Sequence, residues 1–200
     1  MKINSEVFEK AEKVGSEVLV VTKYFDVATT KEIFGKVKDR SCFLGLGENR
    51  SEVLAKKGIL RDRCHFIGNI QSRKIGEIGE FCSVIHSLDS LSHARKFMKA
   101  GDFTSFFIQI NLDPTKSSGV DPQLIPEFLK IIPEDRVLGI SAIGKGDFTI
   151  PEKINEFKEL KKIRDTYLPG KKISAGTSRD FEIALSEGIE IVRVGQALFN

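Results

Sequence analysis

Eight short runs rich in β-branched and aromatic residues alternate with eight segments of helical periodicity along the sequence. Strands that alternate with helices form parallel sheets, because each helix carries the chain back to the end from which the next strand starts. Eight such units favour a closed TIM-type (β/α)8 barrel, although 200 residues is near the lower bound for that fold. A doubly wound open sheet, with one or two strands wrongly assigned, is the alternative.

The expected strands cover residues 17–23, 42–47, 64–68, 83–87, 104–112, 136–143, 172–176 and 190–195. The expected helices lie near residues 5–15, 30–34, 50–57, 72–79, 91–99, 151–167 and 179–187, with one more that carries Leu124, Phe128 and Ile131 on one side. No linker or low-complexity segment interrupts this order, so we expect residues 1–200 to form a single domain.

Composition excludes several classes of protein. No apolar run approaches the roughly 20 residues of a membrane-spanning helix, and the chain begins with a charged stretch rather than an apolar signal core. We therefore expect a cytoplasmic protein with no membrane association. The net charge of +3 does not suggest a nucleic-acid binder.

Cysteine and histidine spacing indicates no metal site. Cys42, Cys64 and Cys82 include no CxxC pair, and we expect them to be small buried residues. The histidines at positions 65, 86 and 93 lack the spacing of metal ligands, and we interpret each as a surface or hydrogen-bonded residue.

Barrel active sites lie at the carboxyl ends of the strands, and Lys23 closes the first expected strand there. A lysine in that position can pair with an anion, or its desolvated amine can form a Schiff base with a carbonyl. It can also simply extend into solvent.

The ends of the seventh and eighth strands resemble a phosphate site, because many barrels bind phosphate there with loop amides. Gly176 permits a close backbone approach, Ser178 offers a hydroxyl, and Gly195-Gln196 could complete the cradle. Ordinary helix capping is the alternative, since Thr177 and Asp180 have capping-box spacing.

Arg193 lies two residues before Gly195, so both belong to the same face of the strand. If that face is the interior, the guanidinium can face a phosphate or a ring nitrogen. An arginine beside a pyridine nitrogen disfavours protonation of the ring. An outward Arg193, paired with a helix carboxylate, is the alternative.

Six motifs in order resemble those of the pyridoxal phosphate homeostasis proteins, a family similar to the barrel domain of alanine racemase. They are Val20-Val21-Thr22-Lys23, Gly47-Glu48-Asn49-Arg50, His65-Phe66-Ile67-Gly68-Asn69-Ile70-Gln71, Gln109-Ile110-Asn111, Ser174-Ala175-Gly176-Thr177-Ser178 and Val192-Arg193-Val194-Gly195-Gln196-Ala197-Leu198-Phe199.

The resemblance implies a set of cofactor-binding residues. Lys23 would hold pyridoxal 5′-phosphate (PLP) as an internal aldimine, and Arg193 would face the pyridine nitrogen. The phosphate would be held by Ser178, Gly195 and Gln196. Asn49 would line the pocket beside the ring, with Ser174 and Thr177 nearby.

Some residues depart from the family pattern. The family usually has threonine at Gln196 and asparagine at Arg73, and methionines where Ala175 and Thr177 stand. The chain also stops at Asn200, without the usual closing helix. Weaker cofactor retention is the expected consequence.

The resemblance implies a monomeric protein of intracellular PLP homeostasis that binds the cofactor reversibly and buffers it or delivers it to apo-enzymes. No committed turnover is expected, because racemisation needs a second acid/base group, which in alanine racemase comes from another domain. The alternatives are a weak PLP-dependent amino-acid racemase with Lys23 as a base, or a barrel enzyme acting on a small phosphate ester with Lys23 as a charge clamp.

Overall fold

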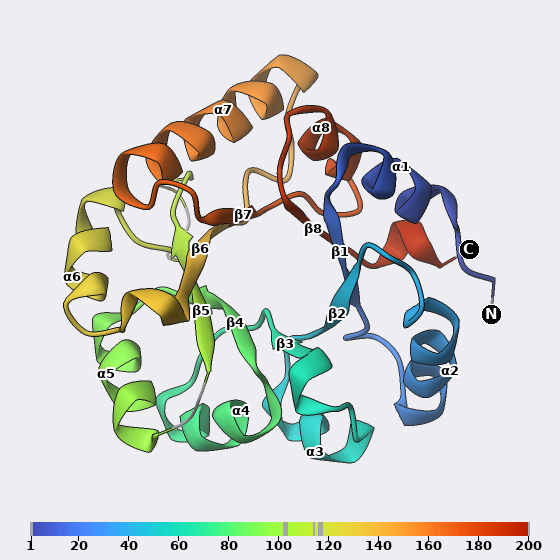
Figure 1. Cartoon of the computed structure of the whole chain (residues 1–200), viewed down its shortest axis with the longest axis horizontal. Helices are drawn as coiled ribbons and strands as arrows, with labels where there is room; N and C mark the ends of the chain where they lie inside the picture. The colour runs from blue at the N-terminus through green and yellow to red at the C-terminus, as the bar shows by residue number, and fades with distance from the viewer. Residues whose placement is uncertain (1, 102–103, 114, 116–117, 200) are drawn as a thin grey trace.

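Parallel pairing runs from β1 to β8 in chain order and closes when β1 pairs with β8, Leu19 lying opposite Arg193. The computed structural model describes residues 2–101, 104–113, 115 and 118–199. Figure 1 shows the strands as an inner ring, with the helices arranged around it. The predicted TIM-type barrel is thus confirmed, and the open sheet is excluded because both of its edges would be unpaired.

The strands are β1 (Glu17–Val21), β2 (Phe43–Glu48), β3 (Cys64–Phe66), β4 (Val84–Leu88), β5 (Ser105–Ile110), β6 (Val137–Ala142), β7 (Lys172–Ser174) and β8 (Ile191–Val194). The helices are α1 (Glu6–Val14), α2 (Val27–Val37), α3 (Leu54–Lys57), α4 (Ile75–Phe81), α5 (Leu91–Ala100), α6 (Ile125–Leu129), α7 (Ile150–Tyr167) and α8 (Phe181–Ser186). Short 3-10 turns precede α3, α4 and α6, and another, Gln196–Leu198, follows β8.

Two apolar cores result from the alternation of side chains along each strand. Val18 and Val20 of β1 point outward and join the large core between the barrel and its helices. Leu19 points inward and packs with Phe107 and Ile191 in a small interior core. Inward positions near the carboxyl ends of the strands are therefore free to carry polar groups.

Several helix boundaries and faces differ from the expectation. Helix α2 starts at Val27 rather than residue 30, because the Asp26 carboxylate accepts the N–H of Thr29 and caps the first turn. Leu124 was wrongly assigned to the apolar side of its helix. It is 40% exposed in a 3-10 turn, and Ile125 is buried instead.

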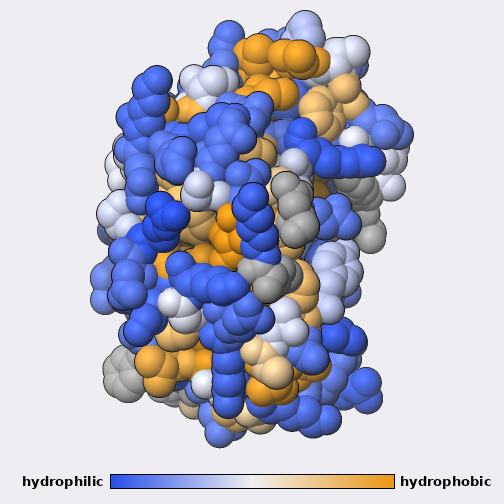
Figure 2. Space-filling view, turned by 90° about the vertical axis from the view of Figure 1, so that its right-hand side faces the viewer, coloured by the Kyte–Doolittle hydropathy of each residue, from blue (hydrophilic) through white to orange (hydrophobic). Residues whose placement is uncertain are grey.

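The surface agrees with the polar composition. Figure 2 shows a mostly hydrophilic face with a few gathered hydrophobic side chains. Cys42, Cys64 and Cys82 are buried and free, as predicted. Within the described ranges, no helix has both the length and the apolar character needed to cross a membrane.

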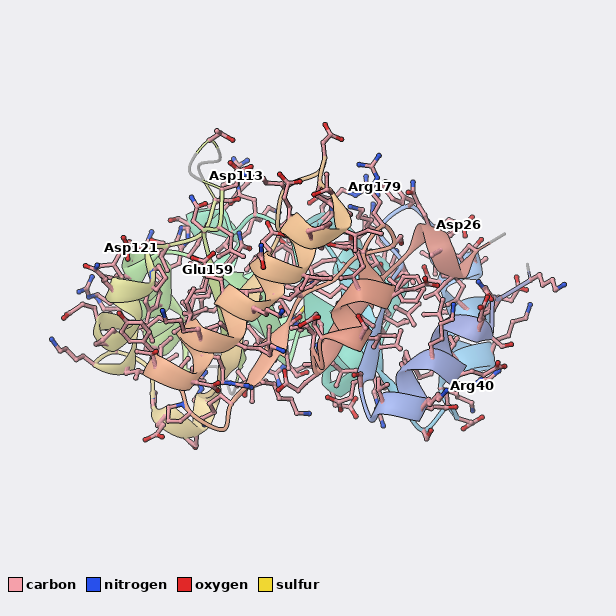
Figure 3. The ribbon with its side chains drawn as sticks, turned by 90° about the horizontal axis from the view of Figure 1, so that it is seen from above. Asp26, Arg40, Asp113, Asp121, Glu159 and Arg179 are labelled. Atoms are coloured by element: carbon pink, nitrogen blue, oxygen red, sulfur yellow. The ribbon has the colours of Figure 1, made fainter. Side chains whose placement is uncertain are left out.

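The loops that follow the strands collect at one end of the barrel. Asp26 follows β1, Asp113 follows β5 and Arg179 follows β7, and all three lie toward one edge in Figure 3. Arg40, which precedes β2, lies toward the opposite edge. This end is where a barrel carries its binding residues.

Candidate functional site

A cavity of about 440 Å³ opens at the carboxyl ends of the strands. That volume is within the range of roughly 300–1,000 Å³ that small-molecule sites occupy. Its lining comes from the ends of strands on both sides of the barrel, namely Val21, Lys23, Tyr24, Asn49, Ile67, Gly68, Asn69, Ile143, Thr177, Ser178, Arg179, Arg193, Gly195 and Gln196.

The cavity brings together most of the residues that the sequence singled out. They are Lys23, Asn49, Thr177, Ser178, Arg193, Gly195 and Gln196. Ser174 does not reach the cavity wall. It is fully buried in the barrel interior, where its hydroxyl lies 2.8 Å from Nδ1 of His86.

Lys23 lies two residues beyond the last residue of β1, on the same side of the chain as the inward-facing Val21. Its side chain is half-buried, and Nζ lies 4.9 Å from the centre of the Tyr24 ring. Arg50 donates to the Lys23 carbonyl oxygen at 3.4 Å, which ties the loops after β1 and β2 together. The amine therefore sits at the cavity wall.

A buried ion pair lies directly behind this lysine. Thr22 points outward, and its hydroxyl donates to Glu48 at 2.5 Å. Lys57 of α3 pairs with the same carboxylate and donates to the Thr22 carbonyl oxygen at 2.8 Å. Both charged side chains are almost fully buried, so this network fixes the backbone on either side of Lys23 and Asn49. This network could not be predicted from the sequence, because nothing in the residue spacing marks Lys57 as a buried residue.

The turn after β7 is built by glycine and by side-chain hydrogen bonds. Gly176 has φ +87°, and a Cβ there would lie 2.6 Å from Cβ of Ala184. The carboxylate of Asp180 accepts both the N–H and the hydroxyl of Thr177, at 2.6 and 2.8 Å. In a full capping box the first residue would also accept a backbone N–H of the helix. Here only the contact from the Asp180 carboxylate to Thr177 is formed, and α8 begins at Phe181.

Ser178 joins this turn to the end of β8. Its hydroxyl oxygen accepts the backbone N–H of Gly195 at 3.1 Å and that of Ala197 at 3.2 Å. Two amides that converge on one oxygen form a small donor cradle at the cavity wall. Such a cradle also suits an anionic oxygen.

Arg193 faces the barrel interior and is only 5% exposed, so an outward, paired arginine is excluded. One terminal nitrogen, Nη2, donates to the carbonyl oxygen of Ala142, while Nε is buried without a hydrogen-bond partner among the described residues. Burial lowers the pKa of Arg193 to about 10, so the group is still a cation at neutral pH. A buried cationic donor at the cavity wall suits an acceptor atom on a bound ligand.

Two histidines inside the barrel complete the polar interior. Nδ1 of His65 lies 2.9 Å from Nε2 of His86, whose other ring nitrogen contacts Ser174. Burial lowers the pKa of His65 to about 3 and that of His86 well below its ordinary value. Both rings are thus neutral at physiological pH. Within the described ranges, no group of histidine, cysteine and carboxylate side chains could hold a metal ion.

The geometry matches a site for an anionic ring compound with a reactive carbonyl. An amine, a buried guanidinium and a donor cradle line one cavity, and Nε of Arg193 lacks an acceptor within the described ranges. A pyridine ring with a phosphate and an aldehyde has a matching set of groups. The residues present therefore fit PLP.

Known proteins resemble this chain in sequence and in fold. No family model matches the chain. A curated relative, "Pyridoxal phosphate homeostasis protein" of Aquifex aeolicus, is 32% identical over 174 residues, covering 77% of this chain and 75% of the relative. The protein of the same name from Pseudomonas aeruginosa is 30% identical over 218 aligned positions, covering 100% and 92%.

Solved structures share the barrel. PipY of Synechococcus elongatus with PLP bound superposes with a TM-score of 0.79 at 23% identity, covering 97% of this chain and 100% of PipY. Alanine racemase of Acinetobacter baumannii has a TM-score of 0.68 at 13% identity, covering 99% and 62%. At these identities the likeness shows the fold alone.

Proposed function

This chain belongs to the pyridoxal phosphate homeostasis protein family, and we propose that it binds PLP in the cavity at the carboxyl ends of its strands and takes part in intracellular PLP homeostasis. The observation that carries the proposal is the position of Arg193. Its guanidinium lies in the wall of the same cavity that Lys23 and Ser178 line, and its buried Nε has no hydrogen-bond partner in the described part of the chain.

Each group of the ligand has a protein group to meet it. Lys23 supplies the amine, and its Nζ bonds to the aldehyde carbon with loss of one water molecule. The Ser178 hydroxyl donates to the phosphate, with Gly195 and the Gln196 side chain beside it and Thr177 nearby. The Arg193 guanidinium donates to the pyridine nitrogen, and Asn49 lies beside the ring.

Arg193 also favours a binding role over catalysis. PLP enzymes use the ring as an electron sink for carbanions, and that role is strongest when the ring nitrogen is protonated. A cationic donor facing the nitrogen disfavours its protonation. The chain therefore holds the cofactor without activating it for turnover.

The proposed function also has consequences for domain organisation, oligomeric state and location. We propose a single domain over residues 1–200 that acts as a cytoplasmic monomer, because every proposed cofactor contact comes from this one barrel. PLP held through a reversible bond can be released to apo-enzymes that need it. Ser174, which contacts His86 instead of the cavity, then supports the site from below.

The visible spectrum of the purified protein with added PLP tests this function. The wild type should develop an absorbance band that Lys23→Ala lacks, whereas Lys145→Ala, which removes an exposed lysine on a neighbouring loop, should keep it. A protein that stays colourless in all three forms but binds small phosphate esters would support the phosphate-ester enzyme instead. Amino-acid racemisation abolished by Lys23→Ala would support the racemase.

A further inference from the structure

A second cavity, here called the lower cavity, opens at the opposite end of the barrel, where the strands begin. Its volume is about 460 Å³, close to that of the cavity around Lys23. It reaches from the outer edge at Arg63 and Lys172 to His65 and Phe107 in the interior. The proposed PLP site uses none of these residues.

The walls of the lower cavity are apolar. Leu44, Val84 and Leu138 point into it and are only partly buried, although they pack on the interior core. Phe107 and Ile191 close its inner end and are almost fully buried. Interior side chains normally fill a barrel of eight strands. Here they leave a hollow whose surface an apolar body can cover.

One buried polar side chain lines this apolar hollow. His65 is 3% exposed and lines the cavity, and its Nδ1 is held by His86. Its other ring nitrogen, Nε2, has no partner in the part of the chain that the structure describes. The ring is neutral, because burial lowers its pKa to about 3. Nε2 is therefore suited to one neutral hydrogen bond with a bound molecule.

The rim of the lower cavity is charged, with more cations than anions. Lys172 pairs with Glu17 at 2.5 Å, so these two charges balance. Arg63 is 45% exposed, and its Nε is 3.9 Å from the carboxylate of Asp62, too far for a hydrogen bond. Among the residues that the structure describes, the Lys171 ammonium donates only to the carbonyl oxygen of Glu134. The rim thus favours a ligand with one negative charge.

We propose that the lower cavity binds a small aromatic monocarboxylate whose ring bears one N–H or O–H donor. Its ring packs against Leu138 and Phe107, the donor meets Nε2 of His65, and the carboxylate stays at the rim beside Arg63. The carboxylate keeps its partial hydration there, which avoids the cost of burying a charge. This inference does not depend on the proposed function.

The contacts of His65 predict where the ring protons lie when the ligand is bound. Nε2 of His65 can accept the ligand's N–H or O–H only if the ring proton of His65 is on Nδ1. That Nδ1–H then donates to Nε2 of His86. His86 must in turn carry its proton on Nδ1 and donate to the Ser174 hydroxyl oxygen. Binding therefore selects one tautomer for both rings.

Indole-3-acetate is a suitable probe, because the protein has no tryptophan whose fluorescence would overlap that of indole. Its fluorescence anisotropy should rise to saturation with one site per chain, and saturating PLP should not displace it. Indole lacks the carboxylate and should bind about two- to fivefold more weakly. Naphthalene-1-acetate lacks the N–H and should bind about two- to tenfold more weakly.

Variants locate the probe. Val84→Phe narrows the lower cavity and should weaken binding at least about tenfold, whereas Val14→Phe enlarges an exposed valine of α1 and should not. Arg63→Gln should weaken binding about two- to fivefold, with the exposed Arg95→Gln as the matched control. Nitrogen-15 spectra of the wild type with the probe bound should show both His65 and His86 in the stated tautomer.

Several results would contradict binding in the lower cavity. Absence of saturable binding would overturn the proposal, and so would displacement of the probe by PLP or binding unchanged in Val84→Phe. Saturable binding that leaves the ring proton of His65 on Nε2 would also overturn it, because Nε2 could not then accept the donor of the probe. None of these results affects the visible spectrum that tests PLP binding.

Discussion

The hydroxyl oxygen of Ser178 accepts the backbone N–H of Gly195 at 3.1 Å, and this contact joins the chain after β7 to the chain after β8. A second amide, from Ala197, donates to the same oxygen at 3.2 Å. One side chain therefore holds together the two loops that we place around the phosphate. The contact makes the cradle sensitive to a change of a single atom.

Ser178→Ala removes the acceptor and one proposed phosphate contact. We expect the affinity for PLP to fall about tenfold, because a hydrogen bond to a charged group contributes about 1.5 kcal/mol or more. Equilibrium dialysis against PLP measures it. Ser186→Ala, which removes an exposed hydroxyl at the end of α8, is the control. Equal affinities of the wild type and Ser178→Ala would contradict the assignment.

Lys57→Met should destabilise the protein by about 3–5 kcal/mol, because it leaves the carboxylate of Glu48 charged, buried and unpaired. Urea unfolding measures the change. The double variant Lys57→Met, Glu48→Gln should recover a large part of the loss, since it removes the unpaired charge as well. A double variant no more stable than Lys57→Met would mean that packing, not charge, sets the cost.

Arg193→Met removes the guanidinium but keeps an apolar side chain of similar length. The affinity for PLP should fall about 10- to 100-fold, because the proposed hydrogen bond to the ring nitrogen is charge-assisted. The rate at which an apo-enzyme in excess takes up PLP from the protein should rise accordingly. If release is equally fast from both forms, Arg193 does not contact the cofactor.

Stability should decrease as the pH falls below about 6.5, the ordinary pKa of histidine. Burial lowers the pKa of His65 to about 3 and that of His86 strongly, so the unfolded chain binds more protons than the folded one in this range. Each group contributes at most about 1.4 kcal/mol per pH unit. Urea unfolding between about pH 7 and pH 5 measures the slope.

His65→Phe tests the origin of that slope. The variant keeps a flat ring beside His86 and removes one of the two titrating groups, so the dependence of the unfolding free energy on pH should fall by about half. An unchanged slope would assign the pH dependence to groups other than this pair.

Much of the fold could be predicted from local sequence, because runs such as Val18–Val21 and Phe106–Ile110 suit buried parallel strands and no other element of that length. The ends of strands could not. β1 was expected to continue to Lys23, but the strand ends at Val21, because the chain turns where the Thr22 carbonyl oxygen accepts the N–H of Phe25 at 3.0 Å, while the Thr22 hydroxyl donates to Glu48. That contact depends on a residue 26 positions away, which no local pattern contains.

The sequence predicts which residues share a face of a strand, but not how deep in the barrel each side chain lies. Alternation put Arg193 and Gly195 on one face of the strand, and both line the cavity, but it left open whether that face was the interior. The depth of Ser174 depends on how strands tilt and stagger in the closed barrel, which brings its hydroxyl to His86 instead of the cavity. Lys153 shows the same limit: it is buried on α7 by Glu156 and Asp180, contacts that only the folded chain assembles.

Reduction of the PLP-loaded protein with borohydride, followed by peptide mass spectrometry, tests the central claim most directly. Borohydride makes a lysine–PLP bond permanent, so the modified peptide identifies the lysine that held the cofactor. We predict one phosphopyridoxyl group per chain, on Lys23, and none at that position in Lys23→Ala. Stoichiometric modification at another lysine, or none at all, would contradict the account of this barrel as a PLP-binding protein that uses Lys23.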